Sequence, residues 1–128
     1  MKAIVGMVWW LAAGSCSVVW AQQPQQRIAG IYSNLYYNEE GGDLLGMELL
    51  IIPKSSGYVA CVQVAEGGSP DVVVVPVSIR GASIEFTMPR NSPYSGAHLS
   101  GTITSSGIVL HWPQGDKEVL PRSKSYWQ

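Results

Sequence analysis

The feature that most constrains the fold is a series of short β-branched runs, separated every 8 to 14 residues by clusters of Gly, Ser, Pro and Asn. Such spacing is typical of an all-β domain. From residue 28 onward we find no stretch with the 3.6-residue apolar period of an amphipathic helix. The pattern predicts eight strands, at residues 28–37, 44–54, 58–65, 72–80, 83–88, 98–104, 108–112 and 117–127.

Three of the connections are two-residue turns, which fix the residues that face each other across the hairpin. The turn at residues 80–83 carries Gly81 at its first central position, which favours type II′ geometry. The turns at 54–57 and 104–107 set a register in the same way. All three produce an apolar face, through the pairs Ile79–Ile84, Val77–Phe86, Val75–Met88, Ile103–Ile108, Gly101–Leu110, Leu99–Trp112, Ile51–Ala60, Leu49–Val62 and Met47–Val64.

The order of turns and longer loops predicts an antiparallel up-and-down meander. In a meander alternate connections lie at the same end, so the longer loops at 38–43, 66–71, 89–97 and 113–116 are expected to share one end. Eight sequential strands close most simply into a small barrel, which removes exposed edges. The alternative is a two-sheet β-sandwich, because Pro76 falls within a strand and favours an edge or a bulge.

This layout is similar to the small calycin barrels, the lipocalin-like and avidin-like folds. The resemblance lies in strand number, in sequential order and in a Gly30-Ile31-Tyr32 element in the first strand. It implies a barrel whose interior holds side chains or one small ligand. Tyr32 stands where lipocalins commonly carry Trp, so the resemblance assigns no ligand and no residue role.

The first 21 residues resemble a secretory signal peptide. Lys2 is followed by an apolar stretch at 4–13 that is too short to span a bilayer, and Val19-Trp20-Ala21 suits cleavage after Ala21. The protein is therefore expected to be periplasmic or secreted. The alternative is a lipoprotein cut before Cys16 and anchored to the membrane there. Residues 22–27 are expected to be a disordered lead-in, and residues 28–128 a single domain.

Charge and cysteine content narrow the class of partner. Without Lys2, seven basic residues face nine acidic ones, which argues against nucleic-acid binding. After cleavage only Cys61 remains, so no intrachain disulfide can form. The thiol is expected to be buried, but its register opposite Leu50 places it on the outer face, where it could join two copies. We expect a monomer or a weak dimer.

The shared end of the long loops is the predicted working surface. It collects most of the acidic residues, one arginine and a tyrosine in the longest loop, and loops carry function more often than the scaffold does. The predicted contact residues are Glu39, Glu40, Asp43, Asp71, Arg90, Tyr94 and Asp116. The other interpretation is that turns are simply where Asp, Glu and Gly belong.

No catalytic, metal or cofactor motif is evident. Ser100 is expected opposite His111, but neither a nucleophile turn nor an orienting acid accompanies the pair, so the protein is expected not to be an enzyme. Bulky residues occupy most inward positions, which favours a filled interior. We therefore expect an exported protein-interaction module, such as a periplasmic inhibitor, an immunity-type protein or an envelope assembly factor. The alternative is a lipocalin-like binder of a small apolar or amphipathic ligand.

Overall fold

The computed structural model describes residues 27–128. The expected signal peptide, both candidate cleavage points and all of the lead-in except Arg27 lie outside the described residues. Within the described part, no helix has the length and apolarity needed to cross a membrane.

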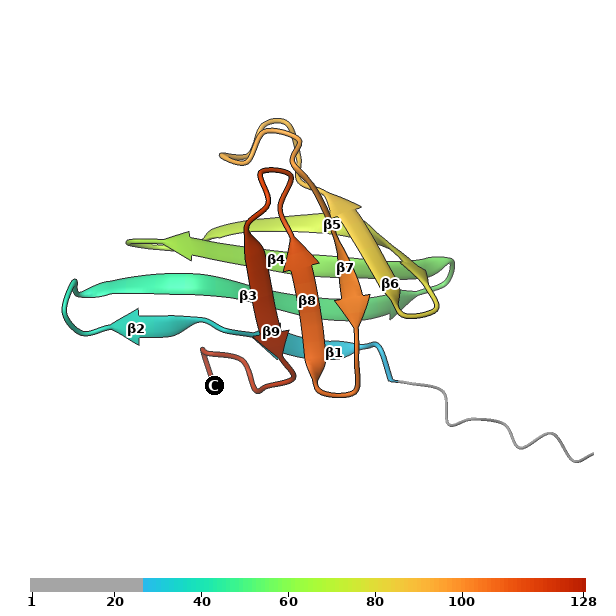
Figure 1. Ribbon diagram of the computed structural model, residues 1–128, viewed down its shortest axis with the longest axis horizontal. Coiled ribbons are helices and arrows are strands. Elements are labelled where there is room, and N and C mark those ends of the chain that lie inside the picture. Colours follow the sequence, from blue (N-terminus) through green and yellow to red (C-terminus); the bar gives the residue numbers. More distant parts are fainter. Residues whose placement is uncertain (1–26) are drawn as a thin grey trace, which may run out of the picture.

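The described chain is all-β, with nine antiparallel strands (Figure 1). Their bounds are β1 Gly30–Ser33, β2 Tyr36–Asn38, β3 Asp43–Lys54, β4 Gly57–Glu66, β5 Asp71–Arg80, β6 Ser83–Thr87, β7 His98–Ile103, β8 Gly107–His111 and β9 Lys117–Pro121. The strands form one sheet in the order β1-β3-β4-β5-β6-β7-β8-β9, and β2 also pairs with β3. The predicted meander is confirmed.

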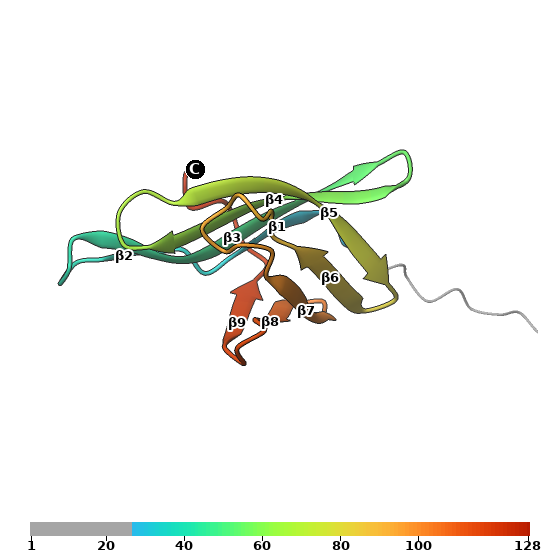
Figure 2. The ribbon, with the colours of Figure 1, turned by 90° about the horizontal axis from the view of Figure 1, so that it is seen from above.

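The sheet is a nearly closed, flattened barrel (Figures 1 and 2). Strands β1 to β5 form one long layer, and strands β6 to β9 cross it steeply as a second layer. The core lies between the layers and consists of tightly packed apolar side chains, with Tyr32, Met47, Leu49, Ala60, Val62, Leu99, Leu110 and Leu120 completely buried. The expectation of a filled interior agrees with this packing.

The hairpin registers match the sequence analysis at their centres. Leu49 pairs with Val62, Ile79 with Ile84 and Gly101 with Leu110. The Val77–Phe86 and Val75–Met88 pairs, however, do not form. Strand β5 pairs with β4 up to Val77 and with β6 only from Ser78, because here the chain passes from one layer to the other.

The first predicted strand is interrupted at Asn34 and Leu35. The side-chain Oδ1 of Asn34 accepts a hydrogen bond from the Met47 amide at 2.7 Å. In a continuous ladder the backbone carbonyl of Asn34 would accept this bond. That carbonyl turns towards Gly46, where a Cβ would lie only 2.6 Å from it. The register is the same on both sides, with Ser33 opposite Glu48 and Tyr36 opposite Leu45. The Asn34 side chain thus competes with the backbone for a hydrogen bond and divides the strand, but the pairing register with β3 does not change.

The last predicted strand is shorter than expected and ends at Pro121. Arg122 forms an isolated bridge with Tyr32, and the Ser123 amide donates to the Ile31 carbonyl at 3.1 Å. These contacts bring β9 against β1 and nearly close the barrel. The remaining residues then turn onto the outer side of β3, where Ser125 and Tyr126 bind the Glu48 carboxylate.

Candidate functional site

An open cleft of about 380 Å³ lies where the β8–β9 hairpin crosses the ends of β3 and β4. Four separate segments build it: β3, β4, the loop after β6 and the hairpin before and within β9. The lining residues are Gly46, Val64, Ala65, Glu66, Tyr94, Trp112, Gln114, Asp116, Lys117 and Glu118. The cleft therefore includes residues from three of the long loops: Glu66 from 66–71, Tyr94 from 89–97, and Gln114 and Asp116 from 113–116.

Two aromatic rings form the apolar part of this cleft. The Tyr94 and Trp112 ring centroids are 5.5 Å apart, with the planes tilted by 45°. Both rings are partly buried and pack against the main core. A tilted pair at this distance is a favourable aromatic contact, so the two rings are held together without being covered.

The loop that presents Tyr94 is fixed by its own hydrogen bonds. The Ser92 hydroxyl donates to the Pro89 carbonyl at 2.6 Å and accepts from the Tyr94 amide at 3.3 Å. At the loop's base, the Met88 amide donates to the Ala97 carbonyl at 2.8 Å. The hairpin that presents Trp112 is closed similarly, because the Trp112 amide donates to the Asp116 carbonyl at 2.8 Å. The cleft is thus largely preformed.

The surroundings of Tyr94 keep its hydroxyl protonated. Burial, together with the negative charges of Glu66 and Asp71, raises the pKa of Tyr94 to about 12. At neutral pH the phenol is therefore a hydrogen-bond donor beside carboxylates.

The polar rim of the cleft is mainly acidic. Glu66, Asp116 and Glu118 contribute three carboxylates, against the single ammonium group of Lys117. Glu118 is held in place because Nδ2 of Asn34 donates to its Oε2 at 3.0 Å. Together with the aromatic pair, this rim suits a cationic group that also carries apolar surface.

The structure brings some of the predicted contact residues together. Tyr94 and Asp116 both line the cleft, and Asp71 lies near enough to Tyr94 to raise its pKa. Tyr94 is partly buried, because its ring packs against Trp112 and the core.

The other predicted contact residues do not line the cleft. Glu39 and Glu40 are exposed in the turn between β2 and β3, at the far tip of that hairpin (Figure 1). Asp43 is partly buried, packs against Gly67 and leaves its Oδ1 without a hydrogen-bond partner. Arg90 is exposed and folds back towards Gly96 of its own loop.

The spread of these residues has one cause. All four long loops lie at the same end in the meander, but the two layers cross steeply (Figure 1). The loops after β2 and β4 consequently extend along one direction and those after β6 and β8 along another. The single acidic rim predicted from the sequence is therefore divided, and only part of it surrounds the cleft.

Several residues that line the cleft are not among the contacts predicted from the sequence, notably Trp112, Lys117 and Glu118. The sequence predicts Trp112 as the last inner-face residue of the strand at 108–112, but β8 ends at His111, and Trp112 lies one residue beyond it on the rim of the cleft. Glu118 alternates within β9 between exposed neighbours, which gives no signal of its own. Its role becomes visible only through the contact with Asn34, 84 positions away.

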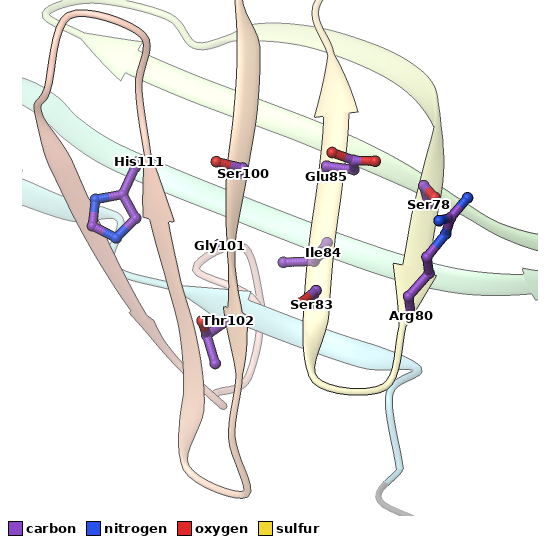
Figure 3. A pocket seen from close by; sticks show the side chains of 9 residues that line it. All are labelled: Ser78, Arg80, Ser83, Ile84, Glu85, Ser100, Gly101, Thr102 and His111. Atoms are coloured by element: carbon purple, nitrogen blue, oxygen red, sulfur yellow. The ribbon is translucent and has the colours of Figure 1, made fainter.

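A second hollow, of about 390 Å³, lies on the outer face of β5 to β8 (Figure 3). Ser78, Arg80, Glu85, Ser100 and His111 contribute polar groups to it. Ser100 and His111 are in register as predicted, but the His111 ring extends away from the serine. Glu85 instead contacts His98 at 3.3 Å, and both side chains are about half exposed. The hollow thus lacks an assembled nucleophile and base.

Among residues 27–128, no group of three or more His, Cys, Asp or Glu side chains is placed to hold a metal ion. No protein-family model matches the chain, and neither a curated protein nor a solved structure is detectably similar to it.

Proposed function

We propose that this protein is an exported, non-enzymatic interaction module that binds a protein partner through the cleft formed by Tyr94, Trp112, Glu66, Asp116 and Glu118. The export part of the proposal comes from the first 21 residues, with cleavage after Ala21 and a periplasmic or secreted location. A lipoprotein anchored at Cys16 is the alternative location. A periplasmic inhibitor, an immunity-type protein and an envelope assembly factor would all use such a surface.

The observation that carries the proposal is the combination of an aromatic pair with three carboxylates in one preformed cleft. A lysine or arginine side chain from a partner would place its apolar stem against the Tyr94 and Trp112 rings and its charge near the carboxylates. The filled core supports a protein partner over a ligand stored inside the barrel, since its side chains occupy the space that such a ligand would need.

A small amphipathic ligand is the second candidate. The cleft volume of about 380 Å³ falls within the range of small-molecule sites. Such a ligand would bind at the mouth of the barrel, not within it. An amine with an apolar body would meet the same aromatic and acidic groups as a lysine side chain.

A partner-capture experiment tests the proposal. The tagged protein, with its sequence otherwise unchanged, is used to recover binding proteins from an extract of its own cell envelope. Glu66→Gln and Asp116→Asn variants remove two charges from the rim while preserving shape. Glu39→Gln and Glu40→Gln make the matched control, because they remove two charges at the far hairpin tip.

We expect the cleft variants to lose a specific partner that the control variants retain, and we expect the loss to be mimicked by raised salt. Equal recovery by both pairs of variants would contradict the proposal. Native mass spectrometry of the purified protein distinguishes the second candidate, since a bound amine that disappears with Asp116→Asn would favour a small ligand.

A further inference from the structure

An apolar surface covers the outer side of the long layer, away from the cleft. Leu50, Cys61 and Val74 are in register across β3, β4 and β5, and Ile52, Val59 and Pro76 form the next row. Val72 lies beside Gln63, two positions along β5 from Val74. We call these seven residues the outer apolar face: Leu50, Ile52, Val59, Cys61, Val72, Val74 and Pro76.

This face lies outward, although its composition is that of a buried sheet. Val74 is 66% exposed and Val72 is 56% exposed, while the alternate residue Val75 is buried in the core at 2%. An antiparallel sheet with one side in water normally alternates apolar and polar residues. Strand β5 reads Val72-Val73-Val74-Val75 instead, so both of its sides are apolar.

Charged groups are kept out of the outer apolar face. Neither row contains a charged side chain. Glu48, which lies two residues before Leu50 on the same side of β3, is only 2% exposed because Ser125 and Tyr126 cover and bind its carboxylate. Trp127 borders the face, since its Nε1 donates to Oε1 of Gln63 at 2.8 Å.

The area of this surface is sufficient for an interface. Leu50, Ile52, Val72 and Val74, with the neighbouring Tyr126 and Trp127, are 36–66% exposed. From typical areas of large side chains, they present about 500 Å² per copy and about 1,000 Å² in a symmetric pair, which is where a biological interface begins. A single patch of this size is at the upper end of what monomers expose.

We propose that the outer apolar face binds a second copy of this chain, face to face about a two-fold axis that passes near Cys61. A neutral apolar surface is complementary to itself, and a two-fold interface uses the same patch on both subunits. The sheet edge is a poorer contact than the face. Strand β5 pairs with β6 only from Ser78, so the earlier part of β5 has a free edge on the side away from β4. Pro76 lies in that part and has no N–H to donate to a strand added there.

The test measures the solution mass of the protein, in the form that its cell produces, by light scattering over a range of concentrations. Val74→Glu places a charge at the centre of the outer apolar face. Val119→Glu is the matched control, because Val119 is an exposed valine, at 51%, on β9 in the other layer. Neither valine contributes to the core, so both variants are expected to fold, and their thermal unfolding is compared with that of the parent.

We expect a mass of two chains for the parent and for Val119→Glu, and a mass of one chain for Val74→Glu. Because each dimer carries the substitution twice, its dissociation constant should rise at least about 100-fold. A short bismaleimide should join two parent chains through Cys61 but should join neither Val74→Glu nor Cys61→Ser chains through this position.

Three outcomes would overturn the inference. The parent chain could have the mass of one chain at the highest soluble concentration. The two valine variants could associate equally. The protein could be monomeric and bind vesicles of phosphatidylethanolamine and phosphatidylglycerol in a manner that Val74→Glu abolishes, which would make a lipid surface the occupant. The cleft is not part of this surface, so failure here would leave the proposed function untouched.

Discussion

Nδ2 of Asn34 donates a hydrogen bond to Oε2 of Glu118 at 3.0 Å, and this contact joins the interruption between β1 and β2 to the rim of the cleft. The same amide group donates to the Val119 carbonyl at 3.2 Å, and its oxygen accepts from the Met47 amide. One side chain thus links β3 with β9. It therefore contributes both to the closure of the barrel and to the position of a cleft carboxylate.

Replacing Asn34 with alanine should destabilise the protein by about 2–3 kcal/mol. The substitution removes hydrogen bonds to three partners and leaves the Met47 amide, next to a fully buried side chain, without its acceptor. Urea unfolding followed by fluorescence measures the change. Asn91→Ala is the control, because Asn91 is exposed in the loop after β6 and should alter the free energy of unfolding very little. Equal effects of the two variants would show that the Asn34 contacts contribute no net stability.

The raised pKa of Tyr94 makes a prediction about stability at alkaline pH. The hydroxyl ionises near pH 10 in the unfolded chain and at about 12 in the folded protein. Between these values the unfolded chain releases a proton that the folded protein retains, so unfolding becomes more favourable as the pH rises. The stability that comes from burying neutral Tyr94 is therefore fully present below pH 10 and is lost as the pH approaches 12.

Tyr94→Phe should remove that part of the alkaline destabilisation. An ultraviolet titration of the folded protein should also lose one late-ionising tyrosine, while Tyr32, whose pKa is raised by burial against the opposing effect of Arg122, still ionises late. Tyr37→Phe, at an exposed site on β2, is the control for the removal of a tyrosine hydroxyl as such. An unchanged late phase in Tyr94→Phe would show that the environment of Tyr94 does not suppress its ionisation.

The sequence was most informative where structure is local. The two-residue turns determine strand pairing over short distances, and Leu49 opposite Val62 and Gly101 opposite Leu110 were both predicted from them. The angle between the layers was not accessible in the same way. It depends on the bend of β5 between Val77 and Ser78, and no residue pattern specifies how far a strand turns as it leaves one partner for another.

The candidate site shows the same limit. Tyr94 and Asp116 were identified because loop composition is visible in a sequence, and both line the cleft. Glu39 and Glu40 were included for the same reason, but the steep crossing of the layers places them at a distant tip. The interruption at Asn34 was not predicted either. It depends on a pairing across two strands, in which the Asn34 side chain takes the hydrogen bond of its backbone carbonyl and Gly46 leaves room for that carbonyl.

The carboxylate of Glu48 should hold the end of the chain against β3. It is buried and accepts hydrogen bonds from the Ser125 hydroxyl at 2.6 Å and the Tyr126 amide at 2.9 Å. Glu48→Gln removes the charge and replaces one of the two accepting oxygens with an NH2 donor, so only one of the two bonds can keep its acceptor. This should reduce the free energy of unfolding by about 1–2 kcal/mol. We expect the segment after Pro121 to detach more often, so trypsin should cleave after Arg122 and Lys124 several times faster.

Glu85→Gln provides the control for that experiment, because the Glu85 side chain is 51% exposed and its ionic contact is with His98, which is 54% exposed. It should change neither stability nor the rate of cleavage measurably. Rapid cleavage at Lys124 in the unsubstituted protein would mean that the Glu48 contacts do not restrain the segment in solution.

Gly101 distinguishes a packed barrel from a hollow one. A small residue on the inner side of a strand could serve to leave space for a ligand, and alanine would then be tolerated. The structure shows a different requirement: a Cβ at Gly101 would overlap the carbonyl oxygen of Val109, because β7 and β8 approach closely there.

Gly101→Ala should therefore reduce the free energy of unfolding by more than about 3 kcal/mol, since backbone atoms must move to relieve the overlap. Ser100→Ala, at an exposed adjacent position, should cost less than about 0.5 kcal/mol. Similar unfolding curves for the two variants would indicate that β7 and β8 can separate at Gly101. The barrel would then have space for a ligand inside it.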